Sequence, residues 1–384
     1  MSHHSRITAI DAIPVRLPRD LDAARGTAGT PNLLTGDGDY RWSADYPCLY
    51  PTHIETALVR VTLDSGLIGW GEAQAPLAPE VACAIVERLL RPAIVGEEFD
   101  GARETIERLW TRMYAAMRVR GQTGGFMLDA ISGIDIALWD LAGKLADKPV
   151  AALLAENPKT RVPAYLSGVA GPTLHDKIHY AARYHDAGFH IFKIYLESDW
   201  NAILEQVDAL HDRLSGDVEV AVDALWHVDP HDAPRLDNHG ALWLECPLMP
   251  EEFQAHLDLA RHMSTPLALG ESYRTLRELE PFFDRRVMGW VQPDLGRCGI
   301  TESMRIAARA ADTGVKVVPH VSIAMGPQIA AAIHFAAAAP ACDLCEYNPK
   351  VLDVANRFVD SPIALDGPSY IVPDRPGLGI EVRI

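Results

Sequence analysis

The stretch HIFKIYL, residues 190–196, decides the fold, because it has the pattern of a short buried strand and is one of eight such segments. They begin about 22 to 30 residues apart and are separated by stretches with the apolar spacing of helices. Eight strands that alternate with helices predict a parallel α/β barrel. An open doubly wound sheet is the alternative, but no glycine-rich phosphate loop follows the first strand. The other segments are VPAYLSG (162–168), VEVAVDA (218–224), ALWLECP (241–247), PLALGES (266–272), MGWVQPD (288–294), VKVVPH (315–320) and ACDLCEYN (341–348).

The first third of the chain has a different pattern. Residues 5–17 and 54–74 alternate apolar with polar side chains and predict an antiparallel hairpin or meander. Residues 18–50 show no period and predict a long loop, which in other proteins is often a lid over a site or a disordered segment. Residues 80–118 and 128–146 have helical spacing.

The composition limits the classes of function. Of 384 residues, 48% are hydrophobic and 23% charged, and no run of about 18 apolar residues predicts a membrane span. The net charge of −17 disfavours binding to nucleic acid or to an anionic membrane, so an anionic substrate would need a local cation. Residues 1–8 do not have the pattern of a signal peptide, and we expect a cytoplasmic protein. Cys342 and Cys345 form a lone CxxC that we interpret as small buried residues of a strand.

Ionisable side chains occupy the ends of seven consecutive predicted strands. In a parallel barrel these ends form one rim, where the active site lies. One or two such residues could be solvated strand ends, but seven buried charges without partners would each cost several kcal/mol. We therefore expect a functional site. The residues are Lys193 with Tyr195, Asp223, Glu245, Glu271, Asp294, His320 and Glu346.

Three of these residues, Asp223, Glu245 and Glu271, come from neighbouring strands. Their carboxylates would repel one another unless a cation lies between them, and oxygen ligands without histidine or cysteine favour Mg²⁺. A structural network of ion pairs is the alternative, although few basic residues lie at these strand ends.

Asp294 and His320 end the next two strands. Neighbouring parallel strands can bring the carboxylate to the imidazole, which would fix its tautomer and raise its basicity. A histidine satisfied within the core is the alternative. The expected position of His320, beside an aspartate and across from a metal site, favours the role of a general base.

Taken in order, these motifs resemble the enolase superfamily, and within it the mandelate racemase group. The resemblance also includes an N-terminal hairpin, GLIGWGEA (66–73), a helix, SGIDIALWDLAGK (132–144), and a final segment, PDRPGLGIEV (373–382), and it covers nearly the whole chain. It implies a modified (β/α)7β barrel over residues 126–349. An α+β capping domain would comprise residues 1–125 and receive residues 350–384, with the 18–50 loop closing over the site.

The resemblance also implies roles for the strand-end residues. Asp223, Glu245 and Glu271 would bind Mg²⁺, Asp294 and His320 would form a catalytic dyad, and Glu346 would hydrogen-bond the substrate carboxylate as it becomes enolate-like. The substrate would be a small carboxylate, and the protein a homo-oligomer.

The second strand departs from the pattern of many group members, which have Lys-x-Lys there. Here the pair is Lys193 and Tyr195. Lys193 could neutralise a substrate carboxylate or enolate, and a lysine that extends from the rim to water is the alternative. A tyrosine, with a pKa of about 10, suits a hydrogen-bond donor or acid better than a base, which disfavours racemisation.

We therefore predict a hydro-lyase that acts on an acid sugar, an aldonate or aldarate. His320 would abstract the α-proton, a protonated Glu346 and Lys193 would help to disperse the enolate charge, and water would leave with help from His320 or Tyr195 to give a 2-keto-3-deoxy acid. The alternatives are a racemase, epimerase or lactone cycloisomerase on the same scaffold, a metal-dependent hydrolase, and a non-catalytic sugar-acid binder. Further candidates for substrate contact are Tyr40, Arg41, Trp42, His227 and Ser322.

Overall fold

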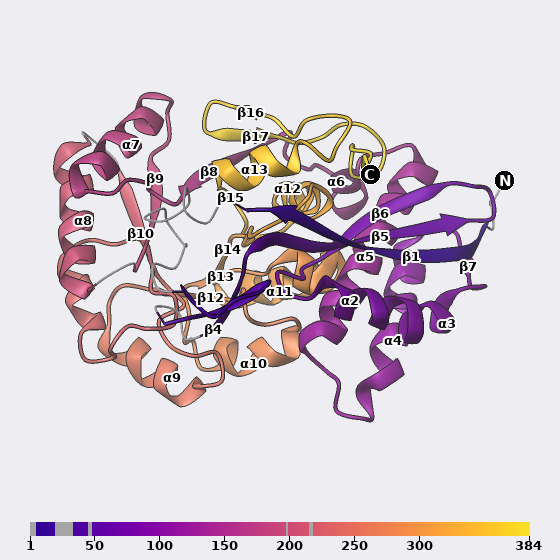
Figure 1. Ribbon diagram of the computed structural model, residues 1–384, viewed down its shortest axis with the longest axis horizontal. Coiled ribbons are helices and arrows are strands. Elements are labelled where there is room, and N and C mark those ends of the chain that lie inside the picture. Colours follow the sequence, from indigo (N-terminus) through magenta and orange to yellow (C-terminus); the bar gives the residue numbers. More distant parts are fainter. Residues whose placement is uncertain (1–4, 20–33, 45–47, 197–198, 215–217) are drawn as a thin grey trace.

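Figure 1 shows the computed structural model, which describes residues 5–19, 34–44, 48–196, 199–214 and 218–384. A sheet with helices, built from the N-terminal part, lies beside a larger α/β barrel. None of the described helices is long and apolar enough to cross a membrane.

The barrel contains the eight predicted strands in chain order, which confirms the predicted fold. From β8 to β14 each strand pairs in parallel with the next, and β15 pairs with β8. A parallel bridge between Val317 of β14 and Cys342, three residues before β15, connects the two ends of this series. The strands are β8 (Arg161–Ser167), β9 (Ile191–Tyr195), β10 (Glu219–Asp223), β11 (Leu244–Glu245), β12 (Leu267–Leu269), β13 (Trp290–Val291), β14 (Lys316–Val317) and β15 (Cys345–Tyr347).

Helices cover the outside of the barrel, as expected for crossover connections between parallel strands. Most present apolar residues to the strands and polar residues to water. They are α7 (Leu174–Asp186), α8 (Trp200–Arg213), the 3-10 helix η2 (Ala233–Asn238), α9 (Phe253–His262), α10 (Leu276–Asp284), α11 (Leu295–Thr313) and α12 (Pro327–Ala338).

The barrel interior is filled by side chains, so it is a packed core beneath the site. Tyr165, Trp243 and Trp290 contact one another there, with ring centroids 5.5 Å and 4.9 Å apart for successive pairs. The indole of Trp243 donates a hydrogen bond to Glu245, so this core supports a residue of the rim.

The predicted antiparallel meander is confirmed as part of a four-stranded sheet with the order β6-β5-β1-β7. The strands are β1 (Ser5–Pro18), β5 (His53–Leu63), β6 (Ile68–Ala73) and β7 (Glu98–Phe99). Helices over the predicted range follow β6, namely α2 (Pro79–Ile85), the π-helix η1 (Val86–Leu90), α3 (Arg91–Ile94) and α4 (Arg103–Arg118).

Helix α5 (Gly125–Ala146) packs directly on β6, and the short α6 (Val150–Leu154) follows it. The contact requires glycine, because a Cβ on Gly71 would lie 1.9 Å from the carbonyl oxygen of Gly133. Backbones can approach this closely only where side chains are absent.

The prediction of a loop over residues 18–50 is wrong for part of the range. Three short strands form an antiparallel sheet, β2 (Leu34–Thr35), β3 (Tyr40–Ser43) and β4 (Cys48–Pro51). Strands of two to four residues are too short to show a period in the sequence. Residues 20–33 and 45–47 lie outside the described residues, so closure of this segment over the site stays a prediction.

The last residues contact both parts of the molecule. A hairpin of β16 (Leu365–Asp366) and β17 (Ser369–Ile371) follows α13 (Pro349–Ala355) and pairs with β8 of the barrel, while Leu378 donates to Asp140 of α5. The domain boundaries at residues 125 and 349 stay predictions. Cys342 and Cys345 are buried free thiols, as expected.

Candidate active site

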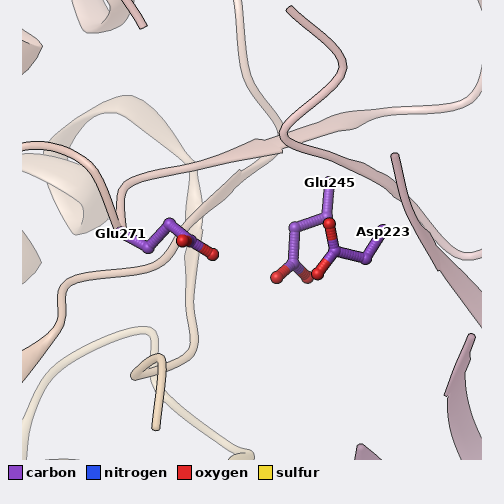
Figure 2. Close-up of side chains that lie close together, drawn as sticks. All are labelled: Asp223, Glu245 and Glu271. Carbon is purple, nitrogen blue, oxygen red and sulfur yellow. The ribbon is translucent and has the colours of Figure 1, made fainter. Parts of the chain in front are cut away.

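The predicted metal ligands lie together at the carboxyl end of the barrel. Asp223 and Glu245 are the last residues of β10 and β11, and Glu271 lies two residues after β12. One carboxylate oxygen from each lies within 4.8 Å of the other two, and all three side chains are buried. Figure 2 shows Asp223 and Glu245 side by side with Glu271 directed toward them.

This cluster fits a divalent cation. Burial raises the pKa of Asp223 well above its ordinary value, and the negative charge of Glu245 raises it further. Such repulsion is relieved when a cation lies between the carboxylates. Three carboxylates without histidine or cysteine form a donor set that suits Mg²⁺.

Lys193 is the buried counter-ion of the rim. Its ammonium lies 2.6 Å from Glu245, 2.8 Å from Glu346 and 3.7 Å from Asp223, and only 1% of the residue is exposed. A lysine extending to water is therefore excluded. The alternative of a structural ion-pair network explains the cluster only in part, because one ammonium contacts three carboxylates, those of Asp223, Glu245 and Glu346.

The predicted dyad is formed. Nδ1 of His320 lies 2.7 Å from Asp294 Oδ2, so its proton is held there and Nε2 is left for chemistry. Nε2 lies 3.3 Å from Glu271, which places the imidazole beside the carboxylate cluster. Burial alone would lower the pKa of His320, but the Glu271 carboxylate and the Asp294 hydrogen bond raise it to about 10.

Gln328 is a site residue that the sequence did not indicate. Its side-chain amide donates to Asp294 Oδ1 at 2.9 Å, beside the backbone N–H of Gly296 at 2.8 Å. Its own backbone N–H donates to Glu72 of β6, so the N-terminal sheet contacts the support of the dyad. The one signal was an amide in the helix PQIAAAIHFAAA, in which His334 is the one further polar side chain.

Glu346 is present at the rim, but the prediction of a protonated carboxyl group is wrong. Burial alone would raise the pKa of Glu346, but the Lys193 ammonium and the nearby His320 lower it to about 2. One oxygen accepts from Ser167 at 2.5 Å and the other from the backbone of Val321 at 2.8 Å. The group is an ionised acceptor.

Tyr195 contacts a second residue that the sequence did not indicate, Ser167. The two hydroxyl oxygens lie 2.7 Å apart. Because Ser167 donates its only hydroxyl proton to the ionised Glu346, the phenol must donate to Ser167. Burial also raises the pKa of Tyr195. Tyr195 therefore offers the cavity an acceptor, which differs from the expected donor or acid.

A cavity of about 480 Å³ joins these residues to the outer surface. Its inner wall contains Lys193, Tyr195, Asp223, Glu271, His320 and Glu346. Of the further candidates, Ser322 also lines it and accepts a hydrogen bond from Gln74. Tyr40, Arg41, Trp42 and His227 are not among the described residues that line this cavity.

The outer wall combines residues from three segments. Arg19, Tyr50 and Ile54 come from the N-terminal part, residues 321–324 follow β14, and residues of α13 complete the wall. The cavity thus has a catalytic floor on the barrel and an outer part bounded by the capping elements.

Comparisons with known proteins identify the family of the chain. Residues 52–155 match the mandelate racemase / muconate lactonizing enzyme N-terminal domain, and residues 177–383 match the enolase C-terminal domain-like family. The chain belongs to the mandelate racemase and muconate lactonizing enzyme family of the enolase superfamily.

Two relatives are acid-sugar enzymes with different reactions. The chain is 30% identical over 343 residues to D-galactarolactone cycloisomerase of Agrobacterium fabrum, covering 85% of this chain and 88% of that protein. It is 30% identical over 339 residues to arabinonate dehydratase of Saccharolobus solfataricus, covering 86% and 89%. A solved enolase superfamily member from Agrobacterium tumefaciens has a TM-score of 0.92 at 28% identity, covering 99% of this chain and 97% of that one.

Proposed function

We propose that this protein is a magnesium-dependent dehydratase of an acid sugar, an aldonate or aldarate. The observation that carries the proposal is the position of His320, whose Nε2 lies 3.3 Å from Glu271 of the carboxylate cluster. A substrate carboxylate bound at that cluster would have its α-carbon near the imidazole.

Asp223, Glu245 and Glu271 would hold the ion. When bound, Mg²⁺ would supply positive charge that offsets Glu271 beside His320 and stabilises negative charge developing on the substrate carboxylate. Lys193 adds a fixed positive charge in the same wall of the cavity.

His320 carries both proton transfers. With Mg²⁺ bound, the charge of Glu271 that raises the pKa of His320 would be offset, which favours the neutral imidazole. Its Nε2 then takes the α-proton while Asp294 holds Nδ1–H, and the imidazolium gives that proton to the departing β-hydroxyl as the C–O bond breaks. Water leaves, and the enol becomes a 2-keto-3-deoxy acid. One residue can do both only if the α-hydrogen and hydroxyl lie on the same face, so the elimination is syn.

Tyr195 has a binding role in this mechanism. Because its proton is directed to Ser167, the phenol oxygen accepts a hydrogen bond from a substrate hydroxyl. This use of Tyr195 fits a polyhydroxylated substrate.

The experiment is to incubate the protein and Mg²⁺ with a library of aldonates and aldarates and to measure 2-keto acid formation. We expect water loss from at least one member, and His320→Asn should lower turnover by about 1,000-fold or more while Mg²⁺ affinity is kept. A complete library that yields no keto acid would contradict the proposal.

A lactone cycloisomerase is the second candidate. One relative has this name. The Tyr195 hydroxyl also donates its proton to Ser167 and so is not available as an acid, and the carboxylate that leaves when a lactone opens needs no acid. The same α-proton abstraction would then give an isomer. Mass spectrometry of the product separates the two, because only the dehydratase product is lighter by one water.

A further inference from the structure

We propose that Gln292, a buried residue directly after β13, holds the metal ligand Glu245 so that its carboxylate offers one oxygen to the ion. This arrangement makes the site selective for Mg²⁺ over Ca²⁺. The inference rests on the proposed function, because that function requires a divalent cation at the carboxylate cluster. It adds a positioning residue, and a determinant of ion specificity, to the three ligands.

One oxygen of the Glu245 carboxylate is fully used by protein donors. Oε2 accepts a hydrogen bond from Nε2 of Gln292 at 2.7 Å and another from Nε1 of Trp243 at 3.0 Å. Because a carboxylate oxygen has about two acceptor positions, Oε2 keeps none for an ion. Oε1 accepts from the ammonium of Lys193 at 2.6 Å and keeps its other position. Glu245 can therefore bind an ion through Oε1 while two donors hold Oε2 in place.

The barrel brings Gln292 to Glu245 although the two residues are 47 positions apart. Glu245 ends β11 and Gln292 follows β13, and alternate strands of such a barrel contribute side chains to one interior layer. Lys193 of β9 and Glu346 of β15 belong to the same alternation, and their side chains lie 2.8 Å apart. Of these four residues only Gln292 is uncharged, so it donates to Glu245 without adding a charge to the cluster.

The amide of Gln292 has one orientation that fits its partner. A carboxylate only accepts hydrogen bonds, so the NH₂ group must face Glu245. The carbonyl oxygen Oε1 of Gln292 is buried and has no hydrogen-bond partner among the residues that the structure describes. A buried polar atom without a partner costs stability, which an apolar side chain would avoid. Packing therefore does not explain an amide at this position, whereas its donation to Glu245 does.

A carboxylate held to one oxygen suits Mg²⁺ better than Ca²⁺. Mg²⁺ requires a near-octahedral set of about six ligands, whereas Ca²⁺ takes about six to eight and often binds both oxygens of one carboxylate. Glu245 cannot supply its second oxygen without breaking the hydrogen bonds from Gln292 and Trp243. The arrangement therefore disfavours the larger coordination sphere of Ca²⁺.

Metal binding without substrate tests the inference independently of turnover. In Gln292→Leu the Glu245 carboxylate loses a donor and can turn, so we expect the Kd for Mg²⁺ to rise by about 10- to 100-fold. The Kd for Ca²⁺ should rise by less than about threefold, because the freed second oxygen compensates for the lost positioning. Calorimetry on chelator-treated protein measures both constants. A general loss of structure would weaken both ions alike, so the ratio of the two Kd values is the readout.

Gln328→Leu is the matched control. It also removes a buried glutamine of the site, but the amide of Gln328 donates to Asp294 and not to a metal ligand. Both Kd values should stay within about twofold of the wild type. Trp243→Phe removes the other donor to Oε2 and keeps an aromatic ring. It should shift the ratio in the same direction, and it serves as the test if Gln292→Leu does not fold.

A crystal of the wild-type protein grown with Mg²⁺ shows the coordination directly. We expect Oε1 of Glu245 on the ion, with Oε2 still bonded to Gln292 and Trp243. An ion bound by Oε2 or by both oxygens, an unchanged ratio in a folded variant, or no Mg²⁺ at the carboxylates would overturn the inference. If the ratio shifts as expected but no acid sugar is turned over, only the proposed function fails.

Discussion

At the scale of the residue, the buried lysine is the counter-ion of the rim. Lys193 contacts Glu245 and Glu346 at 2.6 and 2.8 Å, and removing one partner of a buried ion pair leaves uncompensated charge. We expect Lys193→Met to lower the free energy of unfolding by about 3 to 5 kcal/mol in chelator-treated buffer. Urea denaturation measures this against Lys148→Met, which removes an exposed lysine, and equal stability of the two variants would argue against the pairing.

A substitution of Tyr195 tests whether His320 or Tyr195 is the general acid. Because its proton is directed to Ser167, we expect Tyr195→Phe to weaken substrate binding and to lower kcat by less than about 10-fold. A general acid would be worth about 100-fold or more in kcat. Steady-state kinetics at saturating substrate measure this kcat. A decrease of 100-fold or more would show that Tyr195 is the general acid.

His334 gives the fold an acid-sensitive point away from the site. It is fully buried, and Nε2 contacts the carbonyl oxygen of Leu378 at 3.1 Å, while Nδ1 accepts from Ala151 at 3.3 Å. Burial lowers the pKa of His334 from about 6.5 to about 4. Above pH 6.5 the His334 imidazole is neutral in both the folded and the unfolded state. As the pH falls toward 4, only the unfolded chain takes the proton, so stability is lost.

The loss should approach about 3 kcal/mol. His334→Gln keeps a donor and an acceptor but cannot titrate, so its unfolding free energy should fall less between pH 7 and pH 4.5 than that of the wild type. Parallel pH profiles for the two proteins would show that His334 does not cause the sensitivity.

At the scale of the element, the start of α12 links the N-terminal sheet to the dyad. The carboxylate of Glu72 in β6 accepts hydrogen bonds from the backbone N–H groups of Met325 and Gln328. The side-chain amide of Gln328 in turn donates to Oδ1 of Asp294. We expect Gln328→Leu to lower kcat by about 10- to 100-fold, because Asp294 loses a donor and holds the imidazole less firmly.

A structural role alone would not change the pH dependence of kcat. Gln328→Leu should shift that profile, since Asp294 sets the basicity of His320, and should leave Mg²⁺ affinity within about twofold. Unchanged kcat and an unshifted profile would remove Gln328 from the support of the dyad.

The elements also show how much the sequence could predict. Each barrel strand has enough apolar residues to be recognised, and parallel strands end at one rim, so the strand-end residues from Lys193 to Glu346 could be placed together. Ser167 could not be placed at the site from the sequence. Its role depends on the pairing of β8 with β15, which brings it to Glu346, about 180 residues later in the chain. Strands β2 to β4 were missed because they are too short for periodicity.

The state of each group was harder to predict than its position. Glu346 was expected to be protonated, and its ionisation follows from the 2.8 Å contact with Lys193, which only side-chain geometry provides. The orientation of the Tyr195 hydroxyl likewise depends on a chain of hydrogen bonds that no spacing reveals.

At the scale of the whole molecule, an acidic protein has three basic residues in the lining of its candidate active-site cavity. The net charge is −17, yet Lys193 lies at the floor of the cavity and Lys350 and Arg19 at its outer wall. The barrel supplies the carboxylate cluster and the base, and the capping elements supply part of the outer wall. This arrangement requires one cavity shared by a divalent cation and an imidazole.

Anomalous diffraction from a crystal soaked in Mn²⁺, a surrogate for Mg²⁺, tests that requirement most directly. We predict one strong peak among the carboxylates of Asp223, Glu245 and Glu271, with Nε2 of His320 facing the same cavity. A peak elsewhere with none at these carboxylates, or an imidazole turned away from the ion, would contradict the account.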